Sequence, residues 1–210
     1  MDEQVLTATR RSLHGIAELL LAGSQYREHG TIRLRVTPGG FGQVAGRLRV
    51  EGTDLVWDDG SGGRAPLRGS CRDLGKVAGV EAGAPEGLYS DHSGVEPDDE
   101  LAVDPAAAEL VAEWFAAGDH ALRNFVPGCE PVLWPEHFDL GVQLDEINYG
   151  VSAGDPVYSW PYAYVAPWVK CRGPFWNAPF GAIRRYDEVP AGPLATSAVM
   201  AFFVEGRKMA

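Results

Sequence analysis

The amino-acid sequence predicts an α+β fold, with mostly antiparallel strands and helices packed on one side. Three observations lead to this prediction. Apolar residues recur at the helical period of 3.6 residues near both ends of the chain and in its middle. Between these segments, apolar and polar residues alternate in short runs bounded by Gly, Pro and Asp, as in strands joined by turns. A chain of 210 residues, 45% of them hydrophobic, suits a single globular domain.

Residues 1–80 predict a helix, several strands and a second helix. Apolar side chains fall on one helical face from Glu3 to Ala22, and we expect Gly23 and Ser24 to end that helix. The glycine-rich run from Pro38 to Gly42 is typical of a tight connection between strands. The elements expected after the first helix are strands at Thr31–Thr37, Gly46–Val50 and Leu55–Trp57, a turn at Asp58–Gly63, the short run Ala65–Leu67 and a helix at Cys71–Val80.

Residues 81–104 are rich in Gly, Pro, Asp and Glu and predict a long loop. Asp104 is a good helix N-cap and Pro105 suits the first helical position, so we expect a helix from Ala106 to Ala117, with an extension to Phe125 open. The elements expected beyond it are strands at Val132–Trp134, His137–Glu146, Tyr158–Trp168 and Ala182–Val189, a Gly- and Pro-rich loop at 169–181, and a helix at Leu194–Glu205.

This order of elements allows two interpretations of domain organisation. In the first, residues 1–210 form one domain. In the second, two similar helix–strands–helix halves, 1–80 and 105–210, are joined by the loop 81–104.

The net charge of −11 is unevenly distributed along the chain. From Glu86 to Asp155 there are 16 carboxylates and a single basic side chain, Arg123. Such a segment repels nucleic-acid phosphates and anionic membranes, so we expect neither as a partner. It is either a solvated acidic face or a surface that attracts a cation or an amine. The oligomeric state is left open.

The cysteines and the N-terminal residues predict a cytoplasmic protein. Cys71, Cys129 and Cys171 lie far apart, and their odd number does not suit a disulfide framework. The N-terminal residues lack the basic start and apolar stretch of a signal peptide. No apolar run approaches the roughly 20 residues that a membrane-spanning helix needs.

Four arginines are expected on one sheet face if the strands that carry them pair as a hairpin. They are Arg33, Arg35, Arg47 and Arg49. Guanidinium groups suit carboxylate and phosphate partners. Such a face would either bind an anion or pair internally with the acidic segment downstream.

The segment from Trp134 to Glu146 is the most informative for function. Alternation turns Phe138, Leu140, Val142 and Leu144 toward the core and places His137, Asp139, Gln143 and Asp145 on the opposite face. His137, Asp139 and Asp145 are therefore the candidate catalytic residues. His137 could act as a general base that Asp139 or Asp145 orients. Whether the protein is an enzyme stays open.

A metal site is a second interpretation of the same segment. His137 and Asp139 have the spacing at which two side chains can bind one ion, as in iron(II) oxygenases. A third ligand would have to come from a carboxylate or from His14, His29, His92 or His120. We assign no metal ligand and name no cofactor.

Aromatic residues crowd the region that follows. Trp and Tyr side chains gather between 134 and 176, and the even positions from Trp160 to Tyr164 are all aromatic. They form either a bulky core or the wall of a pocket for a flat or sugar-like ligand. The candidate ligand-binding residues are Trp134, His137, Asp139, Tyr162, Trp176 and Asn177.

The leading functional hypothesis is therefore small-molecule binding in an aromatic-walled pocket. A protein-interaction module without a catalytic site is the alternative, with the acidic 86–155 surface or the aromatic segment 158–176 docking a partner. A metal-dependent enzyme that uses His137 and Asp139 is the third hypothesis.

Several short stretches, spread over most of the chain, resemble a family of uncharacterised bacterial proteins, frequent in actinomycete-type genomes, that is known only as a domain of unknown function. They are TIRLRVTPGGFG, RLRVEGTDLVW, HFDLGV, YAYVAPW, RRYDEV and LATSAVMAFFVEG. The resemblance implies an α+β fold and no particular activity. In its more distant members Phe138 and Asp139 match best, while the position of His137 can hold another residue. The resemblance therefore favours Asp139 over His137 as a functional residue.

Overall fold

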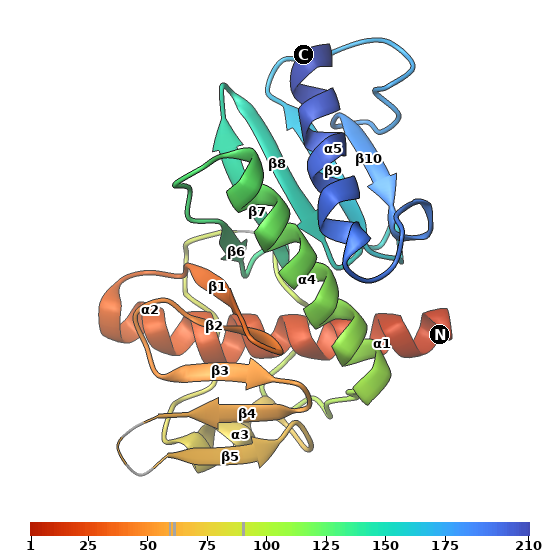
Figure 1. The fold of residues 1–210 in the computed structure, drawn as a ribbon. Coiled ribbons are helices and arrows are strands. Elements are labelled where there is room, and N and C mark those ends of the chain that lie inside the picture. The colour runs from red at the N-terminus through yellow and green to blue at the C-terminus, as the bar shows by residue number, and fades with distance from the viewer. Residues whose placement is uncertain (59, 61, 90) are drawn as a thin grey trace. The chain divides into compact units, whose positions relative to one another are not determined.

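The computed structural model describes residues 1–58, 60, 62–89 and 91–210, and its fold is α+β with antiparallel strands and helices packed on one side, as the sequence predicts (Figure 1). The chain forms two compact units, which we describe separately. Unit 1 comprises residues 1–113 and 133–138, and unit 2 comprises residues 114–132 and 139–210. Within the described ranges, no helix combines the length and the apolar character needed to cross a membrane.

Unit 1 contains helices and one sheet. The helices are α1 (Glu3–Gly15), the π-helix η1 (Ile16–Ala22), α2 (Gly23–His29), α3 (Cys71–Ala78) and the Pro105–Glu113 part of α4 (Pro105–Phe125). The strands are β1 (Leu34–Thr37), β2 (Gly40–Gln43), β3 (Leu48–Glu51), β4 (Asp54–Trp57) and β5 (Gly63–Pro66), adjacent in that order. Leu133 of β6 (Val132–Trp134) pairs with Leu34 of β1. The expected strand at Leu55–Trp57 and helix at Cys71–Val80 are confirmed. Asp59 and Ser61 of the expected turn lie outside the described residues.

The N-terminal helix is longer than predicted, because α1, η1 and α2 form one continuous rod (red, Figure 1). The helix passes through Gly23 and ends at Gly30, whose φ is 69°. Gly23 does not end the helix; it lets another segment of the backbone approach the helix closely. A Cβ atom there would lie 1.8 Å from the carbonyl oxygen of Gly83. The loop backbone therefore rests directly on the helix where glycine leaves room.

We expect Gly23→Ala to lower the free energy of unfolding by about 1–3 kcal/mol, because the added methyl group displaces the Gly83 backbone. Helix propensity alone predicts the opposite sign, a gain of about 1 kcal/mol. Urea unfolding decides between the two effects. Gly83→Ala is the matched control, since its Cβ would meet nothing closer than 3.7 Å. A Gly23→Ala variant as stable as the wild type would contradict the close approach.

The glycine-rich run after Pro38 forms strand β2, where the sequence predicted a connection. Only the Thr37–Gly40 turn makes the connection, with Gly39 at a φ of 73°. A Cβ atom on Gly40 would lie 2.2 Å from the Val50 carbonyl oxygen. The glycines are therefore sites of close strand packing.

The strands that carry the four arginines do not pair as a hairpin, because β2 lies between them. Arg35 and Arg49 nevertheless share one sheet face, since both lie opposite Gly42 in the register of β1, β2 and β3. Arg49 pairs locally with Asp58 at 2.6 Å and with Glu51 at 3.3 Å. Arg47 donates to the carbonyl oxygen of Ala78 at 2.7 Å. Arg49 thus pairs within the hairpin of β3 and β4, whereas Arg47 ties the start of β3 to the last residue of α3.

Two other arginines of unit 1 pair with the acidic segment. Arg11 lies 2.8 Å from Asp99, and Arg72 lies 2.6 Å from Asp98. Both pairs are solvent-exposed, so each contributes little to the stability of the fold. The segment 81–104, which was expected to join two halves, belongs wholly to unit 1. Ser90 of this segment lies outside the described residues.

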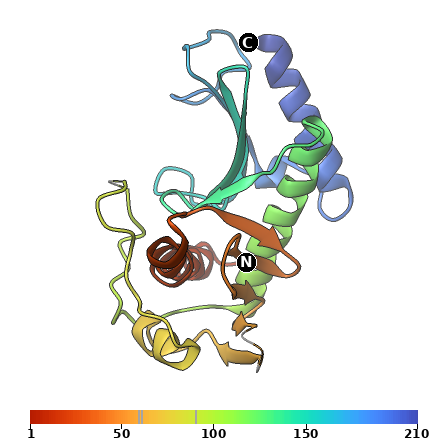
Figure 2. The same cartoon turned by 90° about the vertical axis from the view of Figure 1, so that its left-hand side faces the viewer.

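Unit 2 contains an antiparallel sheet covered on one face by two helices (Figure 2). Its strands, adjacent in chain order, are β7 (Asp139–Leu144), β8 (Ile147–Ser152), β9 (Tyr162–Pro167) and β10 (Ala182–Arg185), followed by the short 3-10 helix η2 (Tyr186–Glu188). Its helices are the Trp114–Phe125 part of α4 (Pro105–Phe125) and α5 (Leu194–Met209). As expected, Asp104 caps α4 by accepting from the Ala107 N–H at 3.0 Å. The buried rings of Tyr149 and Phe203 form the centre of this core, 5.9 Å apart.

Strand β8 was not predicted, because its glycine and asparagine do not suggest a strand. A Cβ on Gly150 would lie 2.5 Å from the hydroxyl oxygen of Tyr164 and 2.3 Å from the Leu140 carbonyl oxygen. The glycine therefore makes room for a tyrosine that crosses the sheet.

Strand β7 begins at Asp139, two residues later than expected. Phe138 has a φ of 51°, and its N–H donates to the Trp134 carbonyl oxygen at 2.9 Å. This turn removes His137 from the strand. At the other end Asp145, with a φ of 53°, lies in the two-residue turn to β8. The expected shared face is therefore wrong for His137 and Asp145.

Candidate functional site

Unit 2 contains a hollow of about 370 Å³ where β8 begins and β9 ends. The loop between β9 and β10 encloses it. The lining residues are Asn148, Ala166, Pro167, Trp168, Lys170, Cys171, Trp176, Ala178, Pro179, Phe180 and Gly181. This volume lies in the range of small-molecule sites, which is about 300–1,000 Å³.

Three aromatic side chains wall the hollow, and backbone contacts position each of them. Trp168 follows β9 directly, its N–H donates to the Glu146 carbonyl oxygen at 3.0 Å, and it is 60% exposed. Phe180 lies at the tip of the tight turn that the Ala178–Gly181 bridge closes. The half-buried Trp176 packs edge-on against Phe175, with ring centroids 4.9 Å apart. The aromatic faces are thus displayed to solvent from an anchored loop.

The polar side chains of the lining are Asn148, Lys170 and Cys171, beside the indole N–H groups that Trp168 and Trp176 carry. Asn177, which the sequence analysis placed in the site, does not line the hollow. Its amide accepts from the Ile183 N–H at 2.8 Å and donates to the Ile183 carbonyl oxygen at 3.1 Å. Asn177 therefore ties the loop to β10, and of the six candidate ligand-binding residues only Trp176 lines the hollow.

The tyrosines and aspartates predicted in this region bond to one another. Tyr164 donates to Asp139, and Tyr162 donates to Asp155 at 2.6 Å. Burial, followed by the charge of Asp139, raises the pKa of Tyr164 well above its usual value. Asp145 is exposed and pairs with Arg207 at 2.7 Å. The Tyr164–Asp139 bond links β9 to β7, and the Tyr162–Asp155 bond ties the loop between β8 and β9 to β9.

Trp134 and His137 belong to unit 1, whereas Asp139 belongs to unit 2. His137 is exposed, and its Nδ1 lies 3.7 Å from the carboxylate of Asp91. The Arg33 guanidinium lies over the Trp134 ring, 5.9 Å from its centroid. The predicted aromatic and acidic residues are thus divided between the two units.

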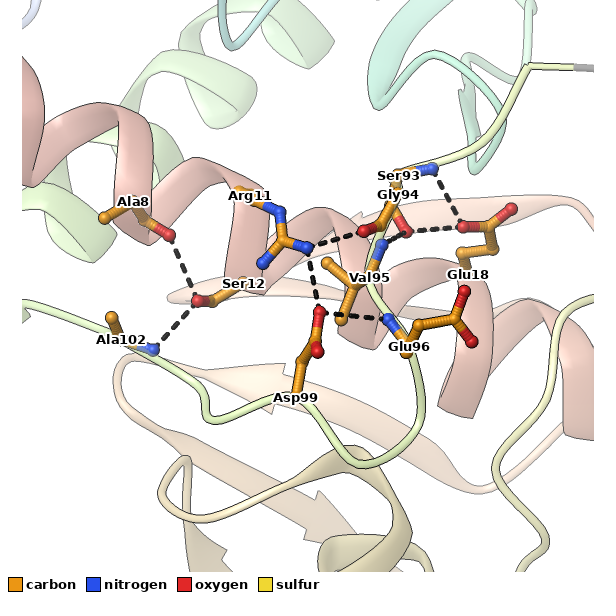
Figure 3. A network of polar contacts seen from close by, with 10 residues as sticks. All are labelled: Ala8, Arg11, Ser12, Glu18, Ser93, Gly94, Val95, Glu96, Asp99 and Ala102. Carbon is orange, nitrogen blue, oxygen red and sulfur yellow. Dashed lines mark hydrogen bonds and ion pairs between the residues drawn. The ribbon is translucent and has the colours of Figure 1, made fainter.

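Unit 1 contains a buried carboxylate that was not predicted from the sequence. Glu18 lies in the π-helix η1, and its side chain is 2% exposed. It accepts from the Ser93 N–H at 3.0 Å and from the Ser93 hydroxyl at 2.6 Å (Figure 3). Its other oxygen lies 2.7 Å from Nδ1 of His92. An acidic residue within the apolar run IAELLLA was the signal that could have revealed it.

Other polar groups of α1 bind the same acidic segment. Arg11 donates to the Gly94 carbonyl oxygen and to Asp99, at 2.5 and 2.8 Å (Figure 3). The Ser12 hydroxyl accepts from the Ala102 N–H at 2.9 Å. These bonds satisfy backbone groups of a segment without strands or long helices. The polar network of Glu18 and α1 therefore holds residues 92–104 against the helix, and we call this network the clasp.

His14 is the other titratable group at this helix. Its Nε2 lies 2.6 Å from the Pro135 carbonyl oxygen, and its ring stacks on Phe138 with centroids 5.4 Å apart. Burial lowers the pKa of His14 below its usual value. The neutral imidazole, with its proton on Nε2, therefore fits this bond. His14 is a structural group of unit 1.

No cluster of three or more His, Cys, Asp or Glu side chains among the described residues could hold a metal ion. Neither a protein-family model, nor a curated protein, nor a solved structure matches the chain.

Proposed function

We propose that this protein binds a small, flat or sugar-like molecule in the hollow of unit 2. The aromatic wall of Trp168, Trp176 and Phe180 around about 370 Å³ carries the proposal. Exposed aromatic faces attract planar rings and the C–H faces of sugars, and few polar groups suffice to orient a ligand. Asn148 is the uncharged polar side chain placed to do so.

The other two hypotheses have less support. Exposed Val157 and Val169, at 78% and 75%, favour a partner protein on the same aromatic segment, but neither of them lines the hollow. The metal-dependent enzyme required a cluster of ligands around His137 and Asp139, and no cluster of three or more His, Cys, Asp or Glu side chains suited to a metal ion is found among the described residues.

Three further statements belong to the proposal. We propose membership in the bacterial domain family that the sequence resembles. We also propose a cytoplasmic location, which the free thiols of the three cysteines support. We propose that nucleic acid is not a partner, because the net charge is −11.

The hollow can be tested with three probes of different chemistry: indole-3-acetamide, indole-3-acetate and methyl β-D-glucoside. We expect at least one of them to show saturation transfer in NMR and a measurable Kd by calorimetry. Trp168→Ala should weaken that Kd at least tenfold, because stacking on a wall residue is lost. The fold should persist, because Trp168 is 60% exposed.

Val157→Ala is the matched control, an exposed apolar side chain of unit 2 outside the hollow. Its Kd should equal that of the wild type. If no probe binds, or if Trp168→Ala leaves every Kd unchanged, the proposed function is wrong.

A further inference from the structure

We infer that the ligand of the hollow is an anion with a flat apolar body, and that Lys170 binds its charge. This inference rests on the proposed function and names the chemical class of the ligand. The class comprises aromatic carboxylates and related ring-bearing anions that carry one charged group.

The charge distribution around the hollow carries this inference. Residues 156–186, which include the loop of the hollow, contain Lys170, Arg172, Arg184 and Arg185 and no Asp or Glu. The whole chain, by contrast, has 29 acidic and 18 basic residues. The loop that borders the hollow, residues 169–181, therefore carries two basic side chains, Lys170 and Arg172, and no carboxylate.

The ion pairs single out Lys170 among the basic residues of 156–186. Arg184 pairs with Glu205 at 3.5 Å, and Arg185 pairs with Asp187 at 3.4 Å. Across residues 1–58, 60, 62–89 and 91–210, no ion pair is found for Lys170 or Arg172. Only Lys170 of these two lines the hollow, and no carboxylate lines it.

The lining places this charge beside apolar walls. Lys170 stands two residues after Trp168, and Trp176 and Phe180 complete the wall. An ammonium group is a strongly hydrated point charge with three donors, which suits a carboxylate or phosphate oxygen. A ring-bearing anion can stack on the tryptophans and place its charged group against Lys170. A neutral ring of the same shape can only stack on the tryptophans.

An isosteric pair of probes isolates the charge. Indole-3-acetate and indole-3-acetamide have the same ring and side-chain length, and they differ in charge. At 20 mM NaCl we expect calorimetry to give a Kd about five- to tenfold lower for the acetate. Because the contact is exposed, the preference should fall to about twofold or less at 300 mM NaCl.

Lys170→Met removes the charge and keeps the length of the side chain. We expect this variant to bind the two probes with equal affinity, and Lys170→Arg to restore the preference for the acetate. Lys208→Met is the matched control, because Lys208 is an exposed lysine of α5 outside the hollow. It should keep the wild-type preference.

The alkylation rate of Cys171 shows whether the probe binds in the hollow, because this thiol is part of the lining. The experiment uses iodoacetamide and peptide mass spectrometry, which separates Cys171 from Cys71 and Cys129. Indole-3-acetate at saturation should slow the alkylation of Cys171 at least threefold in the wild type. An unchanged rate would mean that the anion binds elsewhere, and would overturn the inference.

The two proposals fail in different ways. If both indoles bind equally and Trp168→Ala weakens both, the hollow binds flat molecules and the anionic class is wrong. The class is equally wrong if the acetate preference survives in Lys170→Met. If neither probe binds and the glucoside also fails, the proposed function itself is wrong.

Discussion

Replacement of Glu18 by Ala is expected to lower the free energy of unfolding by about 2–4 kcal/mol. The carboxylate accepts hydrogen bonds from the Ser93 N–H and hydroxyl, and it is hydrogen-bonded to Nδ1 of His92. Bonds to a charged group contribute about 1.5–3 kcal/mol each, although the half-exposed His92 regains water when its bond is lost. Removal of the buried Glu18 side chain also leaves a cavity, which lowers the free energy of unfolding further.

Urea unfolding and limited proteolysis check this expectation together. We expect the variant to be cleaved faster between residues 86 and 100, because the clasp no longer orders that segment. Glu28→Ala is the matched control, since the Glu28 side chain is 73% exposed on the same helical rod. Its effect should stay below about 0.5 kcal/mol. A Glu18→Ala variant with wild-type stability and cleavage would show that the clasp contributes nothing.

The clasp shows what local sequence patterns cannot express. The periodicity of residues 3–22 predicts the helix, because apolar spacing is a local property. The partners of Glu18 lie more than 70 positions away, at His92 and Ser93. The loop 81–104 is polar and rich in Gly and Pro, so its composition predicts irregular structure and does not show which helix holds it. Only the tertiary fold brings the two segments together.

Glycine caused the main errors in the predicted elements. Gly23 was expected to end a helix and Gly40 to lie in a connection, yet they lie in a helix and a strand, and Gly150 lies in a strand that was not predicted. At each of them a Cβ would collide with backbone or with the Tyr164 ring. A glycine in a sequence is usually expected to mark a turn, because of its conformational freedom. Here its small size matters more, and the neighbour that requires it is distant in sequence.

Local patterns reached one residue of the hollow. The crowding of aromatic residues between 134 and 176 led to Trp176 as a candidate, and Trp176 lines the hollow. His137 failed to join Asp139 on a strand because Phe138 adopts a positive φ, which no alternation pattern reveals. Phe180 was missed because it lies twelve positions after Trp168 and joins the wall only through the fold of the loop, and Lys170 was missed because a lone lysine in a loop forms no local pattern.

The phenol–carboxylate bonds of unit 2 make its stability sensitive to alkaline pH. Burial raises the pKa of Tyr162 and Tyr164 above 10, and the neighbouring carboxylates Asp155 and Asp139 add to the shift. In the unfolded chain both phenols lose their protons near pH 10. Above that pH the folded state binds more protons than the unfolded state, so the free energy of unfolding falls as pH rises. Each phenol contributes a slope of about 1.4 kcal/mol per pH unit.

Tyr164→Phe separates this linkage from general alkaline damage. At neutral pH the variant should be less stable by about 1–3 kcal/mol, because Asp139 loses a hydrogen-bond donor. Between pH 10 and 11.5 its stability should fall less steeply than that of the wild type, by about 1.4 kcal/mol per pH unit, since one shifted phenol is gone. Urea unfolding at each pH measures the slope, and absorbance at 295 nm follows phenol ionisation.

Tyr26→Phe in α2 is the control, because the Tyr26 ring is half-buried and belongs to unit 1. It should keep the wild-type slope. If Tyr164→Phe also keeps that slope, the Tyr164 hydroxyl ionises as readily in the folded chain as in the unfolded chain, and its bond to Asp139 does not stabilise the sheet. If instead the slope decreases while neutral stability is unchanged, burial of the phenol alone shifts its pKa. The neutral-pH stability and the alkaline slope therefore measure the hydrogen bond and the burial separately.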